Sequence, residues 1–317
     1  MLNVNDQIKV GVSSCLLGKK VRFDSGHKKN QYIVNVLAQY FDFVPFCPEM
    51  DIGLGVPRET IRLIEVEDAI KCVGSKTIDL DVTEKLTDSA QRQKSWHRQL
   101  SGYILKKDSP SCGMERVRVY KGSMPERKGT GIYASQLIKN FPHLPIEEEG
   151  RLADPVIREN FIQRVFIYHR WKELTDDMTS WNSVYEFHAQ HKYIFMSHCP
   201  EKAKSLGRWL ADTHSPDISE LSIQYLDKMM KILRIKATKK NHVNTLQHIQ
   251  GYLKKHISAK HKQEMVDVFE QYRLGFLPLI VPITLLKHHF NDHPNEYIND
   301  SFYLKPHPSE LMLLNSL

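Results

Sequence analysis

Long apolar segments are missing from this 317-residue sequence, which has no run of about 18 apolar residues, the length that crosses a membrane as a helix. Its most apolar stretch, residues 276–286, is short and contains Pro278 and Pro282. The first six residues have neither the basic region nor the apolar block of a signal peptide. We therefore expect a cytoplasmic protein that has no membrane partner.

Cysteine is scarce as well, with five residues and no C-x-x-C pair. Secreted domains that depend on disulfides are much richer in cysteine, so this usage indicates a reducing compartment. In such a compartment, functional cysteines bind metals or act in catalysis rather than forming cross-links. Internal repeats and low-complexity linkers are also missing, which argues against repeat architectures.

The remaining composition, 41% hydrophobic and 26% charged, is that of an ordinary globular protein, and the length favours two domains. In the first half, patterns of strand and helix alternate. Strands are predicted at residues 9–13, 41–46, 61–66 and 102–106, and helices at 29–40, 84–99 and 131–140, with Thr83 as an N-cap. This alternation predicts an α/β domain over residues 1–155, with a mostly parallel sheet and helices on both of its faces.

The second half, residues 156–317, predicts an all-α domain. Apolar residues recur there at helical spacing, as in Leu221, Tyr225, Met229 and Leu233. The pattern breaks at Ser215-Pro216, around Thr238, at Gly275 and at His293-Pro294.

Positive charge is unevenly placed in this chain, whose net charge is +7. Residues 228–262 contain ten lysines and arginines and no acid. Such a stretch favours a surface that binds a polyanion, although a solvated helical face is an equal alternative. We expect nearby histidines to extend the phosphate-facing surface, namely His242, His248, His256 and His261.

Three cysteines each follow a predicted strand: Cys15, Cys47 and Cys112. Ligands of parallel α/β sheets bind beyond the carboxyl ends of the strands, so these thiols are expected to meet at one edge. Their loops are rich in glycine, serine and proline, which makes three unrelated buried thiols the weaker alternative. Cys72 and Cys199 lack this context, and we interpret them as structural or incidental.

Three thiolates are able to hold either structural zinc or an iron–sulfur cluster. Structural zinc usually has a fourth ligand and closely spaced cysteine pairs, which this sequence lacks. A [4Fe–4S] cluster on three protein ligands would leave one iron open, and an open iron is suited to binding a sulfur atom of a substrate.

These loops belong to motifs that resemble the thiouracil desulfidase (TudS) family. The matching segments are residues 10–18 (VGVSSCLLG), 21–26 (VRFDSG), 47–58 (CPEMDIGLGVPR), 106–113 (KKDSPSCG), 129–134 (GTGIYA) and 148–152 (EEGRL). The second half resembles the YbgA-like helical domain, through residues 242–254, 272–275 and 306–311. The two together are similar to fused desulfidases that act on 4-thiouridine in transfer RNA (tRNA).

The resemblance implies a [4Fe–4S] cofactor on Cys15, Cys47 and Cys112, with the fourth iron free for the substrate sulfur. It also implies an acid/base role for Glu49. A supporting role is implied for one serine of the turn, where Ser109 is favoured over Ser111 without a clear separation.

Other charged residues are candidates for contacts with the substrate or the RNA. Arg22, Asp24 and Arg58 lie in the same loops as the motifs, and for Asp24 a structural ion pair is at least as good an interpretation. In the helical half, the candidate RNA contacts are Lys236, Lys239, Lys240, Lys254 and Lys255.

The leading hypothesis is therefore an enzyme that removes sulfur from 4-thiouridine in thiolated tRNA. A desulfidase of free thiouracil or its nucleoside is the second hypothesis. The third is a non-catalytic protein that binds zinc and nucleic acid.

Overall fold

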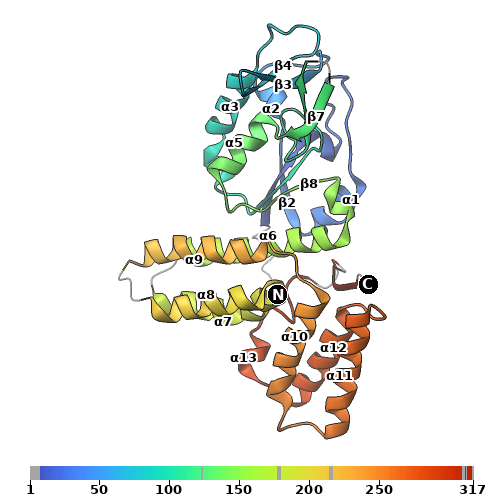
Figure 1. The fold of residues 1–317 in the computed structure, drawn as a ribbon, viewed down its shortest axis with the longest axis vertical. Helices are drawn as coiled ribbons and strands as arrows, with labels where there is room; N and C mark the ends of the chain where they lie inside the picture. The colour runs from blue at the N-terminus through green and yellow to red at the C-terminus, as the bar shows by residue number, and fades with distance from the viewer. Residues whose placement is uncertain are drawn as a thin grey trace. The chain divides into compact units, whose positions relative to one another are not determined.

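The computed structural model describes residues 8–122, 124–176, 180–213, 217–308, 311 and 313–315. The chain divides into two compact units, Met1–Asp154 and Pro155–Leu317, which we call unit 1 and unit 2 (Figure 1). Unit 1 is an α/β domain, and the described part of unit 2 is built from helices, as the sequence predicts.

A four-stranded parallel sheet, sheet A, forms the centre of unit 1. Its strand order is β2 (Phe41–Phe46), β1 (Ile8–Ser13), β5 (Gly102–Leu105) and β8 (Ile146–Glu148). Residues 10–13 of β1 are all buried, as expected for a central strand covered on both faces. The three strands of sheet A that were predicted from sequence are confirmed, and their carboxyl ends lie at the same edge.

A second sheet in unit 1 was largely missed by the sequence analysis. Its order is β4 (Ala69–Gly74), β3 (Ile61–Val66), β6 (Val117–Lys121) and β7 (Met124–Gly129). Only β3 was predicted, and all of the pairings except β3 with β6 are antiparallel. The prediction of a mostly parallel sheet therefore holds for sheet A alone. Charged residues fill β7 so densely that its sequence carries little strand signal.

The helices of unit 1 are shorter than predicted. The helix expected over residues 84–99 is two helices, α3 (Thr83–Arg92) and α4 (Lys94–His97). Thr83 is the first residue of α3 rather than its N-cap, because its hydroxyl accepts a hydrogen bond from the backbone N–H of Cys72 at 2.8 Å. The helix expected over 29–40 is α1 (Gln31–Asn35) followed by a 3-10 turn. In Figure 1, α3 lies beside α5 (Ile132–Asn140), against which it packs.

Unit 2 contains the helices α6 (Pro155–Asp176), α7 (Trp181–His198), α8 (Pro200–Asp212), α9 (Ile218–Leu233), α10 (Lys239–Gln250), α11 (Ala259–Leu274), α12 (Ile280–Asp292) and α13 (Glu296–Asn299). Thr238 caps α10 by accepting from the backbone N–H of Asn241. Gly275 ends α11 at a φ of 87°, a left-handed conformation that favours glycine. The predicted break at Ser215-Pro216 lies outside the described residues, since residues 214–216 are not described.

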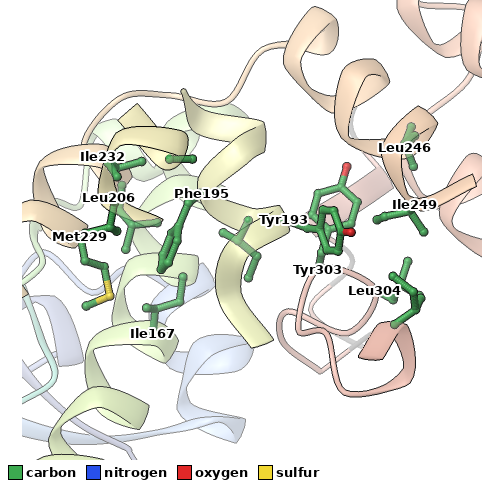
Figure 2. Packing of buried hydrophobic residues seen from close by; sticks show 14 of the residues in the cluster. Ile167, Tyr193, Phe195, Leu206, Met229, Ile232, Leu246, Ile249, Tyr303 and Leu304 are labelled. Carbon is green, nitrogen blue, oxygen red and sulfur yellow. The ribbon is translucent and has the colours of Figure 1, made fainter. Parts of the chain in front are cut away.

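One apolar core spans unit 2, and Figure 2 shows part of it. Burying a large apolar side chain of this kind stabilises a fold by about 1.5–3 kcal/mol. The labelled side chains are Ile167, Tyr193, Phe195, Leu206, Met229, Ile232, Leu246, Ile249, Tyr303 and Leu304. Among the helices that the structure describes, none combines the length and the apolar character needed to span a membrane.

Candidate active site

The three cysteines of the sequence motifs lie at the carboxyl ends of three neighbouring strands. Cys15 lies in a 3-10 turn directly after β1, and Cys47 follows β2 at the start of the short helix α2 (Pro48–Asp51). Cys112 lies in the loop between β5 and β6. Because β1 is hydrogen-bonded to both β2 and β5, the sheet brings the three segments together.

These thiols line a cavity of about 330 Å³, which we call the cysteine cavity. Charged and hydroxyl side chains make up much of its remaining wall. Its lining includes Ser13, Cys15, Arg22, Lys28, Cys47, Glu49, Arg58, Lys106, Lys107, Ser109 and Cys112.

The thiols are poor acids in this environment. Burial, followed by the neighbouring Cys47, raises the pKa of Cys15 to about 11. Burial also raises the pKa values of Cys47 and Cys112, and for Cys112 the charges of Cys47, Glu49 and Cys15 act in the same direction. The donor set therefore suits a group that supplies positive charge, because metal binding stabilises thiolates and releases their protons.

The arrangement of the thiols does not suit a single metal ion. Within the described residues, no three or more histidine, cysteine, aspartate or glutamate side chains are placed to hold one ion. The three thiols instead share the wall of a cavity large enough for a multi-atom group. An iron–sulfur cluster needs thiols that are spaced around a cavity, because each cysteine binds a different iron. A structural zinc ion instead needs all of its ligands around one point.

Glu49 is held on two sides in the wall of the cysteine cavity. One carboxylate oxygen accepts hydrogen bonds from Arg58 Nη2 at 2.5 Å and Arg58 Nε at 3.1 Å. The other accepts a hydrogen bond from Ser111 Oγ at 2.6 Å. Arg58 is only 6% exposed and also donates to the backbone oxygens of Gly55 and Val21. This network fixes the orientation of the carboxylate.

The two candidate serines have different places in this network. Ser111 is fully buried and donates its only hydroxyl hydrogen to Glu49. The 2.9 Å contact between Ser109 Oγ and Ser111 Oγ must then use the Ser109 hydrogen, which gives a chain from Ser109 through Ser111 to Glu49. Ser109 also accepts from the backbone N–H of Cys112 at 3.1 Å, and it lines the cavity.

Gly131 allows helix α5 to approach the loop that carries Cys112. A Cβ atom at this position would lie 2.6 Å from the backbone carbonyl of Ser111, which is too close for any side chain. The backbone of the same loop accepts a hydrogen bond from the N–H of Gly131, through Gly113 at 2.8 Å. The glycine thus holds the cysteine loop against the end of the helix.

The basic candidates of unit 1 separate into two groups. Arg58 is occupied by Glu49 and by backbone carbonyls, as described above. Arg22 lines the cysteine cavity and lies 3.8 Å from Asp24, while the Asp24 carboxylate also accepts from the backbone N–H of Gly26. Lys28 and Lys107 add positive charge to the wall, and sequence reasoning missed both of them. The available signal was that Lys107 lies inside the motif segment 106–113 and that Lys28 lies two residues after the segment 21–26.

The candidate RNA contacts of unit 2 are mostly exposed, including Lys236, Lys240, Lys254 and Lys255. Lys239 is half-buried and lines a separate small cavity. The prediction that His242 extends a phosphate-facing surface is wrong. Its ring is 8% exposed and its Nδ1 lies 2.9 Å from the Tyr303 hydroxyl, because the N-terminal part of α10 packs against the segment that carries Tyr303.

The fold and the cysteine cavity define unit 1 as an α/β domain with three cysteines at the carboxyl edge of a parallel sheet. The model of the 2-thiouracil desulfurase family matches residues 10–149, and that of a family described as a protein of unknown function, DUF1722, matches residues 192–308. The uncharacterized protein YbbK of Bacillus subtilis (strain 168) is 31% identical over 146 residues, which are 43% of this chain and 93% of YbbK. The chain belongs to the 2-thiouracil desulfurase family through its unit 1, and its unit 2 carries a YbgA-like domain.

Two further relatives cover the two halves of the chain. The uncharacterized protein YbgA of Escherichia coli (strain K12) is 26% identical over 154 residues, covering 48% of this chain and 91% of YbgA. Among solved structures, a [4Fe–4S]-dependent thiouracil desulfidase, TudS, is 27% identical. That match covers 46% of this chain and 94% of the solved chain, with a TM-score of 0.38.

Proposed function

We propose that this protein is a [4Fe–4S]-dependent desulfidase that converts 4-thiouridine in tRNA to uridine and releases the sulfur as sulfide. One observation carries the proposal. Three thiols from three adjacent parallel-strand ends share a cavity with a carboxylate that is fixed in place by Arg58 and Ser111. A thiolate-ligated group and an acid/base residue would thus face the same bound substrate.

In this proposal Cys15, Cys47 and Cys112 hold the cluster. Their burial disfavours free thiolates, so the protein needs the positive charge of bound iron to keep them ionised. When bound, a cluster with three protein ligands would supply one Lewis-acidic iron that is open to the sulfur of a substrate. The remaining chemistry belongs to the side chains of this chain.

Glu49 is the acid/base residue of the proposed hydrolysis. It accepts a proton from a water molecule as the water attacks the ring carbon that carries the sulfur. A carbon–oxygen bond forms and the carbon–sulfur bond breaks, so thiocarbonyl and water become carbonyl and hydrogen sulfide without any net oxidation or reduction. Arg58 and Ser111 hold the carboxylate in one orientation, and Ser109 connects this hydrogen-bonded chain to the cavity.

Charge supports a nucleic acid as the substrate. Arg22, Lys28 and Lys107 line the cysteine cavity, and the stretch 228–262 of unit 2 adds ten basic residues without an acid. The cavity is far smaller than a stacked RNA helix, so a thiolated base would have to leave its stack before reaction. The cost of that step is a few kcal/mol, which phosphate contacts would offset.

Free 2-thiouracil is the second candidate substrate, because it is the molecule named by the matching family. A base without its ribose would also fit the cysteine cavity. This alternative leaves the basic stretch of unit 2 without a role in binding the substrate.

The test is anaerobic reconstitution with iron and sulfide, followed by nucleoside analysis of thiolated bulk tRNA before and after incubation. We expect loss of 4-thiouridine with matching gains of uridine and sulfide, and no conversion by Cys47→Ala. Cys199→Ala is the matched control, because this partly exposed thiol lies in unit 2, outside the cysteine cavity. Conversion of free 2-thiouracil without conversion of tRNA would favour the second substrate.

A further inference from the structure

Unit 2 contains a separate cavity of about 110 Å³, which we call the Glu159 cavity. Helix α6 contributes Glu159 and Gln163 to its wall, the end of α7 contributes His198, and the first turn of α10 contributes Lys239 and His242. Tyr272 of α11 also lines it. Polar side chains from four helices therefore converge on a space about the size of one five-membered or six-membered ring.

Glu159 provides an unused acceptor in this cavity. Glu159 is half-buried and takes part in no hydrogen bond among the described residues, and burial raises its pKa to about 7 against the opposing charge of Arg158. A half-buried carboxyl group in a cavity wall can accept a hydrogen bond from a ligand that carries a donor. The ligand should therefore carry hydrogen-bond donors.

His242 provides a donor. Its Nδ1 lies 2.9 Å from the hydroxyl of buried Tyr303, and that hydroxyl has no other acceptor among the described residues. Tyr303 must then donate to Nδ1, and the neutral ring carries its own proton on Nε2. The Tyr272 hydroxyl is a second donor in the wall. The ligand should therefore also offer acceptors.

His198, by contrast, is satisfied within the protein. Its Nδ1 contacts the backbone oxygen of Ile235, and its Nε2 lies 2.7 Å from Gln163 Oε1. His198 and Gln163 therefore form part of the wall. The residues that would contact a ligand are Glu159, His242 and Tyr272.

These requirements discriminate between ligand classes. An ammonium group would satisfy Glu159 but would leave the donors of His242 and Tyr272 without acceptors. A phosphate would satisfy those donors but would be repelled by Glu159. A vicinal diol satisfies both sides, because each hydroxyl donates and accepts, and carboxylates are common partners of ribose hydroxyls.

We infer that the Glu159 cavity binds the 2′,3′-diol of a ribonucleoside, with Glu159 accepting from the diol while His242 and Tyr272 donate to it. In RNA this diol exists only at the 3′ end, one linkage away from a phosphate. Lys239 lies in the cavity wall and the exposed Lys240 follows it in the first turn of α10, where both could meet that phosphate. The inference deepens the proposed function, on which it rests for RNA as the partner, and a free ribonucleoside is the other source of the same chemistry.

The test compares two otherwise identical tRNA transcripts, one ending in an ordinary ribose and one in a 2′,3′-dideoxynucleotide, bound to the full-length reconstituted protein. We expect the dideoxy end to weaken binding about tenfold, the effect of losing a hydrogen bond to a charged acceptor. Glu159→Gln and Tyr272→Phe should bind both transcripts with similar, weakened affinity. Glu186→Gln, which changes an exposed carboxylate of α7, should keep the tenfold difference.

A second arm uses free uridine and 2′,3′-dideoxyuridine, with binding followed by calorimetry. Binding of uridine alone, lost in Glu159→Gln, would support the diol site and identify the free nucleoside as its source. Equal binding of both transcripts together with no binding of uridine would overturn the inference. Failure of the wild-type protein to bind any tRNA would instead overturn the proposed partner. Circular dichroism melting of Glu159→Gln and Tyr272→Phe separates a lost contact from a lost fold.

Discussion

In unit 1 the polar side chains around the cysteine cavity are charged and paired, whereas in unit 2 the buried polar side chains are mostly neutral imidazoles. Glu49 is bound to Arg58, and Lys106 is bound to Glu149. In unit 2, His191, His198 and His242 are at most 8% exposed. The difference shows that the same chain uses two kinds of buried polarity. Charged pairs lie beside the cysteine cavity of unit 1, and neutral hydrogen bonds lie where the helices of unit 2 meet.

Acidification should produce the largest difference in stability between the two units. Burial lowers the pKa of His191 and His242 to about 3 and that of His198 to about 4, while in unit 1 it lowers the pKa of His97 to about 4. The folded protein therefore binds fewer protons than the unfolded chain, whose imidazoles have a pKa of about 6.5. The stabilisation that comes from keeping these imidazoles neutral is complete above pH 6.5 and is lost as the pH falls toward 4.

In unit 2, burial also lowers the pKa of His188 to about 4, while the pKa of Glu159, raised to about 7, offsets one imidazole. At about 1.4 kcal/mol per proton and pH unit, we expect unit 2 to lose about 4 kcal/mol for each pH unit in this window, against about 1.4 kcal/mol for His97 in unit 1. Hydrogen–deuterium exchange at pH 7.5 and 5.5, corrected for the intrinsic exchange rate, follows each unit separately. Earlier opening of unit 1 than of unit 2 would contradict the comparison.

Removing the charge of Glu49 tests whether the polarity of unit 1 serves the reaction. For Glu49→Gln we expect kcat to fall by about 10²- to 10⁴-fold, the contribution of a positioned acid/base group. The iron content should not change, because Glu49 is not one of the proposed ligands. Glu84→Gln, an exposed carboxylate in the first turn of α3, is the control. Equal activity of both variants would remove Glu49 from the mechanism.

Arg58→Lys tests whether Arg58 orients Glu49 or contacts the substrate. Lysine keeps the charge but cannot donate to Glu49 and to the carbonyls of Gly55 and Val21 in the same way. We expect kcat to fall about 10- to 100-fold while KM stays near the wild-type value, as for other residues that orient a functional group. A rise in KM at constant kcat would return Arg58 to the role of a substrate contact.

The smallest expected effect compares one matched hydrogen bond in each unit. In unit 1 the Tyr133 hydroxyl lies 2.7 Å from His97 Nε2, and in unit 2 the Tyr303 hydroxyl lies 2.9 Å from His242 Nδ1. Tyr133→Phe and Tyr303→Phe should each lower the free energy of unfolding by about 1–3 kcal/mol, because each leaves a buried imidazole nitrogen without its partner. Denaturant titrations at pH 7.5 measure both. A negligible cost in unit 2 alone would mean that water reaches His242.

The sequence was most informative where backbone pattern and chemistry coincide. Short β-rich runs that end in Cys15 and Cys47 predicted both the strands and the edge at which the thiols meet. The prediction of Thr83 as an N-cap was wrong because a capping residue is recognised from local sequence, whereas this hydroxyl bonds to Cys72 in a neighbouring strand. The hairpin of β6 and β7 was missed because its stability comes from pairing with β3 rather than from its own charged sequence.

By itself, the sequence determined the α/β-then-helical order of the chain and the three cysteines that follow strands, because local periodicity and motif spacing encode both. Only the tertiary structure decided what each charged or polar side chain does. Arg58 was a candidate substrate contact and is a partner of Glu49, and His242 was a candidate phosphate contact and is buried beside Tyr303. Glu159 had no distinguishing sequence context until four helices converged around it. Hydrogen-bond partners and desolvation depend on distant segments meeting, and no local pattern records that.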